Sequence, residues 1–310
     1  MSAKRLRIAY IPEHFSTPLH FAAKHYALDA DLVSEPLGTG ALTARLKADT
    51  SDEQAVDVAI GLTEGFVADL GKNGGKDGVK YGLAGTYVTS PLCWAISTGA
   101  DRKDVTSVES LKGKKVGVSR IGSGSYVMSY VLADQQKWLK QGEDPFGVEV
   151  IGDFAALRKS VRQEGEKPST EFFMWEHFVS RLLTFLQTTK HFWDNGELKK
   201  VGEIYTPWPS WMIAARSSID QEQLEDLMGK LNAGVKHYQE NSGEAVEHIT
   251  STMKYSKEDA EAWMKTVTFS DDVKGVDGKV VDDTVSVLQK AGVLKAEAGG
   301  SEEMIAIKRA

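Results

Sequence analysis

Short strand patterns alternate with helix patterns along the first part of the chain. Residues 6–11 are β-rich and stop at Pro12, and residues 16–18 supply a cap followed by proline in the first helical turn. Residues 56–61 form a later strand pattern, and a helix pattern follows at residues 65–70. Strands and helices at this spacing predict βαβ units, so we expect an α/β fold with mostly parallel sheets.

The alternation restarts in a second α/β unit near the middle of the chain. Apolar strand patterns at residues 93–97, 115–118 and 148–151 surround a helix pattern at about residues 126–138. A late strand and four helices complete the predicted elements. They occupy residues 211–215, 221–240, 243–252, 256–266 and 282–291, and Gly292 is a suitable helix cap.

Charge and composition exclude several classes of partner. The formal net charge of -7 disfavours a nucleic-acid partner, which requires a basic face. No run approaches the roughly 18 to 20 apolar residues of a membrane helix, so we expect no membrane insertion. The one cysteine, Cys93, allows no internal disulfide and no cysteine-built zinc site. With no visible export signal we expect a cytoplasmic monomer, or a periplasmic protein if a leader was removed.

Several landmarks follow one another in a familiar order. They are the turn at residues 38–40, the phrase SVESLKGKKVGV at residues 107–118, the segment GSGS at residues 122–125, and Trp175-Glu176. Their series resembles the aliphatic-sulfonate, taurine and thiamine-pyrimidine-precursor branch of the type II periplasmic solute-binding proteins. This resemblance allows the chain to be a cytosolic fungal member of that branch. That branch has Trp-Glu-Pro where this chain has Trp175, Glu176 and His177.

This resemblance implies two lobes that close around a ligand by a hinge. Residues 1–90 and 207–310 are expected to form lobe I, and residues 91–206 are expected to form lobe II. Prolines at 91, 207 and 209 mark the two crossings. Thr89 and Ser90 lie at the first crossing, where their hydroxyls could bind a ligand or serve ordinary turn chemistry.

In lobe I the candidate ligand contacts follow predicted strands. His14 lies in the segment that follows the first strand, although a lone histidine is more often structural. Thr39 lies in a glycine-bounded turn before a helix. Glu64 could accept hydrogen bonds from an amine or ring N–H, or it could serve only as an acidic residue in the first turn of a helix.

In lobe II the candidate contacts lie at a helix start. Arg120, Ser123 and Ser125 could hold an anion or a polar head group together with backbone N–H groups. The alternative is a simple N-cap with a flexible turn, because serine and glycine are favoured there without any ligand.

Aromatic side chains are candidate walls of the cleft, because flat rings bury area at little entropic cost. Two of the tryptophans are expected to belong to the core instead. We favour Trp175 and Glu176, because the resemblance places them at a position that faces the ligand, and Trp208 and Trp211, because they flank the second crossing. The aromatic candidates are Tyr87, Trp94, Trp175, Trp208 and Trp211.

Two classes of function remain open. The leading hypothesis is binding of a small molecule without chemistry, the ligand being pyrimidine-like, sulfonate-like or another small organic compound. We identify no catalytic triad, P-loop or cofactor motif. His14, His20 and His25 do not share a helix face, so no metal site is predicted. The alternative is an enzyme of thiamine-pyrimidine-precursor biosynthesis, but the clustered cysteines of those enzymes are missing here.

Overall fold

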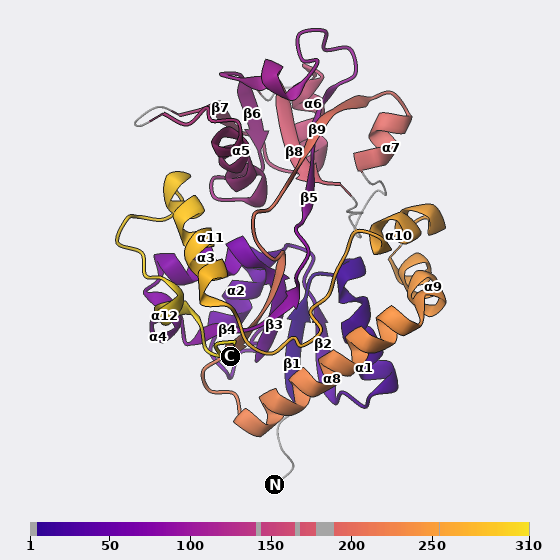
Figure 1. Ribbon diagram of the computed structural model, residues 1–310, viewed down its shortest axis with the longest axis vertical. Coiled ribbons are helices and arrows are strands. Elements are labelled where there is room, and N and C mark those ends of the chain that lie inside the picture. The colour runs from indigo at the N-terminus through magenta and orange to yellow at the C-terminus, as the bar shows by residue number, and fades with distance from the viewer. Residues whose placement is uncertain (1–4, 141–143, 165–167, 178–188, 254, 310) are drawn as a thin grey trace.

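Two five-stranded sheets flanked by helices form two lobes in the computed structural model (Figure 1). The structure describes residues 5–140, 144–164, 168–177, 189–253 and 255–309. The predicted α/β class is confirmed, because each sheet is built from strands that alternate with helices along the chain.

The sheet of lobe I has the strand order β2-β1-β3-β10-β4. Strand β1 lies parallel to β2 and β3, with Ile8 opposite Leu32 and Val58. Every residue of β4 is buried, as is typical of a strand covered on both faces. The strands are β1 (Leu6–Tyr10), β2 (Ala30–Ser34), β3 (Val58–Leu62), β4 (Tyr81–Val88) and β10 (Trp211–Arg216).

The sheet of lobe II has the order β7-β6-β8-β5-β9. Strand β6 lies parallel to β7 and β8, with Val116 opposite Val148 and Phe172. The strands are β5 (Cys93–Gly99), β6 (Lys115–Val118), β7 (Gly147–Val150), β8 (Phe172–Glu176) and β9 (Leu198–Tyr205).

One strand in each sheet runs against its neighbours. Strand β10 is antiparallel to β3 and β4, and β5 is antiparallel to β8 and β9. Each is the first strand formed after the chain passes between lobes, through residues 89–92 into β5 and through residues 206–210 into β10. The sheets are therefore mixed, with four strands in one direction and one reversed, which the sequence pattern did not predict.

The two crossing segments lie side by side and hydrogen-bond to each other. The Thr206 N–H donates to the Leu92 carbonyl at 3.0 Å, and the Leu92 N–H donates to Thr206 Oγ1 at 2.9 Å. The Ser210 hydroxyl donates to the Ser90 carbonyl at 2.8 Å. The covalent connection between the lobes is therefore one narrow pair of extended segments.

Helices cover the sheets, and several of them begin at a side-chain cap. The side chains of Ser123, Asp153, Asp220 and Ser256 each accept a hydrogen bond from an N–H three residues later. No helix in the described part of the chain is long and apolar enough to cross a bilayer. Lobe I carries η1 (His14–Ser16), α1 (Thr17–His25), α2 (Thr39–Lys47), α3 (Thr63–Lys72), α4 (Gly75–Val79), α8 (Gln221–Glu240), α9 (Ser242–Thr252), α10 (Lys257–Met264), α11 (Gly278–Lys290) and α12 (Ser301–Met304), and lobe II carries η2 (Val108–Leu111), α5 (Gly124–Gln135), α6 (Phe154–Val161) and α7 (Thr189–Asp194).

The lobes also touch through helices α5 and α11, which lie next to each other in Figure 1. The Tyr126 hydroxyl donates to the Ala291 carbonyl at 3.1 Å. The Lys290 ammonium lies 3.2 Å from Asp134 Oδ2. These contacts hold the two lobes together at a distance from the crossing segments.

Candidate functional site

A cavity of about 520 Å³ lies between the two lobes. Pockets for small organic ligands usually measure about 300 to 1,000 Å³, so this one can enclose such a molecule. Its lining comes from strand ends, loops and helix starts of both lobes. The predicted site residues that line it are Thr39, Glu64, Arg120, Ser123, Ser125, Trp175, Glu176 and Trp211.

Three glutamates from separate elements line this cavity. Glu13 follows β1, Glu64 lies in the first turn of α3, and Glu176 ends β8. Loss of contact with water raises the pKa of Glu13 and of Glu64 to about 7. Burial raises the pKa of Glu176 well above its ordinary value, and the charges of Glu13 and Glu64 raise it further. A positive charge placed among these groups would favour their ionised forms.

The two carboxylate oxygens of Glu64 differ in their hydrogen bonding. The Trp208 indole N–H donates to Oε2 at 3.1 Å, so Trp208 reaches the site through Glu64 and is not itself a cavity wall. Oε1 has no hydrogen-bond partner among the described residues. It faces lobe II, because a Cβ built on Gly124 at the start of α5 would lie 3.6 Å from it. The free lone pairs of Glu64 are therefore directed across the cleft.

Two tryptophans of the lining also carry unpaired N–H groups. Trp94 is the second residue of β5 in lobe II, and Trp211 is the first residue of β10 in lobe I. Within the described residues neither Nε1 has an acceptor, although Trp94 is 6% and Trp211 2% exposed. A buried polar group left without a partner costs about 1 to 3 kcal/mol. A ligand that offers acceptors to these N–H groups would recover that free energy.

Trp175 supplies an aromatic wall from lobe II. Its side chain is half-buried, and its ring lies 5.1 Å from the ring of Phe154. One face is thus supported by packing while part of the residue lines the cavity. This arrangement suits contact with a planar or cationic ligand.

The hydroxyls of Ser123 and Ser125 are engaged in local hydrogen bonds. Ser123 Oγ accepts from the Tyr126 N–H at 3.3 Å, and Ser125 Oγ accepts from the Ser119 N–H at 3.2 Å. The two hydroxyl oxygens lie 2.9 Å apart. Of the two predicted roles of this segment, the contacts favour the N-cap.

Thr39 and Arg120 approach the cavity from opposite lobes. Thr39 Oγ1 accepts from the Leu62 N–H at 2.9 Å and so joins α2 to β3. Arg120 is exposed, and a Cβ built on Gly40 would lie 3.4 Å from its Nη2 atom. The guanidinium therefore lies at the solvent-exposed side of the cavity and not among the glutamates.

His14 and Tyr87 lie in the core of lobe I and not at the cleft, contrary to our prediction. Both are fully buried. The short helix η1 begins at His14 and turns its ring inward, where its centroid lies 3.9 Å from that of Trp263 and 4.7 Å from that of Tyr255. This burial lowers the pKa of His14 well below its ordinary value. Tyr87 packs edge-on against Phe269, with centroids 5.3 Å apart.

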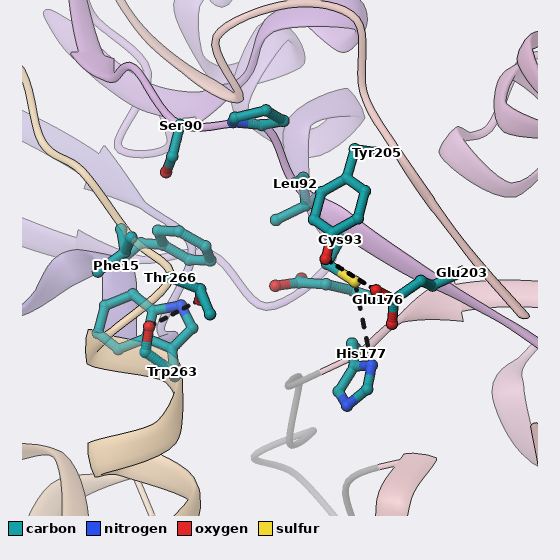
Figure 2. Close-up of a pocket in the computed structure, with 12 residues that line it drawn as sticks. Phe15, Ser90, Leu92, Cys93, Glu176, His177, Glu203, Tyr205, Trp263 and Thr266 are labelled. Carbon is teal, nitrogen blue, oxygen red and sulfur yellow. Dashed lines mark hydrogen bonds between the residues drawn. The ribbon is translucent and has the colours of Figure 1, made fainter.

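The predicted residues of the first crossing lie outside this cavity as well. Thr89 Oγ1 donates to the Thr268 carbonyl at 3.1 Å, which is turn chemistry. Ser90 lines a second, smaller cavity next to the first crossing, together with Cys93 and His177 (Figure 2). Hydroxyls at the crossing therefore connect segments of the protein.

Glu13 is one of the cavity residues that sequence reasoning missed, as are the charged residues Asp69, Lys72 and Asp153. Glu13 directly precedes His14 in the loop after the first strand. The sequence shows only an acidic residue that follows a strand, which gives no reason to prefer Glu13 to His14 as a ligand contact. Trp94 was an aromatic candidate, but nothing in its local sequence distinguishes a cleft position from a core position.

The comparison with family models gives one match. The Ca3427-like PBP model matches residues 94–204, most of lobe II. The comparison with curated proteins gives no match.

Solved structures match over the whole chain. The Candida albicans CA3427 gene product, described as defining a family with the generic periplasmic binding protein fold, is 40% identical with a TM-score of 0.80, and the match covers 98% of this chain and 97% of that one. The alkanesulfonate-binding protein SsuA from Xanthomonas axonopodis pv. citri is 12% identical over 98% of both chains, with a TM-score of 0.69. The nitrate-binding protein NrtA from Synechocystis PCC 6803 is 13% identical over 99% of this chain and 86% of that one, with a TM-score of 0.66.

These two distant likenesses support the fold alone, whereas the match to CA3427 is close over nearly its full length. The predicted periplasmic-binding-protein fold is confirmed, and the chain belongs to the Ca3427-like family of proteins with that fold.

Proposed function

We propose that the protein binds one small, planar, positively charged or protonable organic molecule in the interlobe cavity and closes around it without chemistry. The observation that carries this proposal is the meeting, in one cavity, of three glutamates and two unpaired indole N–H groups. Such a lining requires a ligand that brings both a positive or N–H-rich group and hydrogen-bond acceptors.

The acidic side chains of the lining outnumber its two basic ones, Lys72 and Arg120, which are exposed, so the lining favours a cation over an anion. At 4 Å and an effective dielectric constant of about 20, opposite unit charges attract by about 4 kcal/mol, and like charges repel equally. A sulfonate would be repelled by each of Glu13, Glu64 and Glu176 that is ionised, whereas a cation would lower the raised pKa of these carboxyl groups and favour their ionised forms. An amino-substituted heterocycle such as a pyrimidine could instead donate to Glu64 and accept from Trp94 and Trp211.

The division of these groups between the lobes supports binding by closure. Glu64 and Trp211 belong to lobe I, whereas Trp94 and Glu176 belong to lobe II. A ligand that contacts both sets binds the closed arrangement better than an open one and shifts the population toward it. The paired crossings at residues 89–92 and 206–210 are the proposed hinge.

Catalysis is the second candidate, because carboxyl groups with a pKa of about 7 also suit general acid–base chemistry. Recovery of the bound molecule after prolonged incubation with the protein separates the two functions. A chemically unchanged ligand supports binding alone, and a changed mass supports an enzyme.

Native mass spectrometry of the gently purified protein tests the proposal directly. We expect a co-purified molecule that is protonable and planar once it is released and identified. Glu64→Gln should reduce its occupancy. Glu35→Gln is a matched control, because Glu35 is equally buried but pairs with Arg45 at 2.7 Å and does not line the cavity. A bound sulfonate, or equal occupancy in the Glu64→Gln variant, would refute the cationic class.

A further inference from the structure

The second cavity lies beside three side chains that are suited to metal binding (Figure 2). Cys93, His177 and Glu203 come from or directly follow the neighbouring strands β5, β8 and β9. The His177 N–H donates to the Cys93 carbonyl at 3.0 Å, and Glu203 is paired with Ala95, two residues beyond Cys93 on the same side of β5. Strand pairing thus brings together residues that are far apart in the sequence.

The distances between these groups fit a small coordination sphere. One ligand atom from each residue lies within 4.8 Å of the others, and Cys93 Sγ is 4.0 Å from His177 Nδ1. Around a tetrahedral zinc ion with bonds of about 2.0 to 2.3 Å, ligand atoms lie about 3.3 to 3.8 Å apart. Side-chain shifts of about 1 Å or less would complete that geometry. We propose that Cys93, His177 and Glu203 bind one divalent transition-metal ion, with zinc the closest chemical match.

The choice of metal follows from the ligand types. A thiolate, an imidazole and a carboxylate together suit zinc and related ions, whereas magnesium and calcium prefer oxygen ligands alone. The sequence alone predicted no metal site, because these three residues are far apart along the chain and only strand pairing brings them together. Three protein ligands leave a fourth position for water or a ligand atom.

That fourth position would face a cavity shared by the lobes. Its volume is about 110 Å³, and its wall includes Phe15 and Trp263 of lobe I. Glu176 lines this cavity and also the larger one. A metal ion here would therefore place a positive charge near Glu176, which belongs to the proposed ligand site as well.

Two features of the protein would compete with the metal ion. Glu203 Oε1 accepts from the Tyr205 hydroxyl at 2.9 Å, and Oε2 lies 2.5 Å from the Lys200 ammonium. The Cys93 thiol must also lose its proton to bind the metal, so binding should strengthen as pH rises. Lys200→Met removes the competing cation and should tighten metal binding about tenfold.

Titration of the full-length protein with Co²⁺ tests the site, because cobalt bound to a thiolate gives a strong near-ultraviolet charge-transfer band. Cys93 is the only cysteine, so such a band can come only from this site. We expect the band to saturate at one equivalent and to vanish in Cys93→Ser, with metal affinity lowered more than about 100-fold. A wild-type protein that shows no band up to millimolar Co²⁺ would overturn the proposal.

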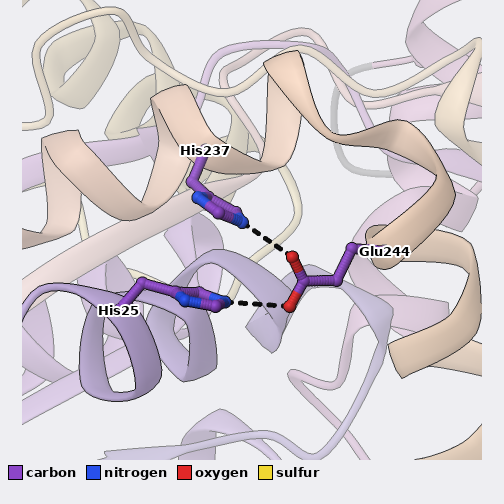
Figure 3. Close-up of side chains that lie close together, drawn as sticks. All are labelled: His25, His237 and Glu244. Carbon is purple, nitrogen blue, oxygen red and sulfur yellow. Dashed lines mark hydrogen bonds and ion pairs between the residues drawn. The ribbon is translucent and has the colours of Figure 1, made fainter.

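A second cluster provides the matched control (Figure 3). His25 Nε2 lies 2.8 Å from Glu244 Oε1, and His237 Nε2 lies 2.9 Å from Oε2, on the surface of lobe I. Cobalt bound there would give weak visible bands and no thiolate band. His237→Ala should leave the charge-transfer band unchanged, and cobalt binding that His237→Ala abolishes would overturn the Cys93 site.

A measurement on the unaltered protein removes any dependence on how the variants fold. Zn²⁺ bound to the Cys93 thiolate should slow its alkylation by iodoacetamide at least about tenfold, as followed by mass spectrometry. An alkylation rate that does not change with Zn²⁺ would count against the site. Denaturant midpoints of Cys93→Ser and His237→Ala show whether each variant is folded.

Discussion

Replacing Glu64 with glutamine should stabilise the ligand-free protein at alkaline pH while weakening ligand binding. The amide resembles the protonated carboxyl and can still accept the Trp208 N–H, but it cannot ionise. A pKa of about 7 in place of 4.5 means that ionising Glu64 in the folded protein costs about 3 kcal/mol of stability. The variant avoids that cost.

The sign of the effect depends on pH. Below about pH 4.5 the Glu64 carboxyl is protonated in the folded and unfolded states, so its titration contributes nothing. Between pH 4.5 and 7 the folded state keeps a proton that the unfolded state has lost, so stability falls as pH rises. Above pH 7 the loss is complete. Glu64→Gln should therefore exceed the wild type by less than about 1 kcal/mol at pH 5 and by up to about 3 kcal/mol at pH 8.

Guanidinium unfolding at pH 5 and pH 8, on protein stripped of ligand, measures both differences. Glu35→Gln should behave oppositely at pH 8 and lose about 1 to 3 kcal/mol, because it breaks the ion pair with Arg45. A Glu64→Gln variant that is less stable than the wild type at pH 8, or whose difference is the same at both pH values, would refute the reasoning.

The other predictions concern the cleft wall, the core and closure. Trp175→Ala should weaken binding of the co-purified ligand by about 2 kcal/mol in calorimetric titration. Ser125→Ala should lower the free energy of unfolding by about 1 kcal/mol and leave ligand affinity unchanged. A Trp175→Ala variant that loses stability but binds the ligand as tightly as the wild type would exclude Trp175 from the site. Below pH 6.5 the unfolded wild type protonates His14 more readily than the folded protein does, so the wild type loses stability and His14→Phe does not. The difference in urea midpoint between His14→Phe and the wild type should therefore grow in favour of the variant from pH 7 to pH 5. A difference that is the same at both pH values would contradict this. Tyr126→Phe removes the hydrogen bond to Ala291 between the lobes and should increase the radius of gyration of the ligand-free protein in solution scattering. Addition of the ligand should reverse this increase. A scattering profile that ligand leaves unchanged would argue against hinge closure.

Local signals predicted many of the elements. The strand at Lys115–Val118 and the helix at Gln221–Glu240 match their predicted bounds, because apolar periodicity and caps mark both ends. Strand β9, Leu198–Tyr205, was missed because it is an edge strand with charged residues among its apolar ones. A strand with only one neighbour needs less apolar surface, and its pattern resembles a loop.

The site depended on contacts that no local pattern contains. Whether Glu13 or His14 faces the cleft is decided by the turn of η1 and by the aromatic rings of Tyr255 and Trp263, more than 240 residues away. Several residues predicted from strand ends and helix starts line the cavity, because such ends gather at one side of each sheet. The choice between neighbouring residues required the tertiary packing.

Lobe II is formed by one uninterrupted stretch of chain, and its entry and exit lie next to each other. The hydrogen bonds between Leu92 and Thr206 fix the two points at which that stretch begins and ends. A whole lobe could therefore be exchanged between relatives at two cuts without altering the spacing of the connection. Trp94, Trp175 and Glu176 would travel with it, while Glu64 and its surroundings stayed behind. Recombination at the crossings would therefore replace the lobe II part of the cavity lining in a single step. The core of lobe I would stay unchanged, so the ligand preference could change without a new fold.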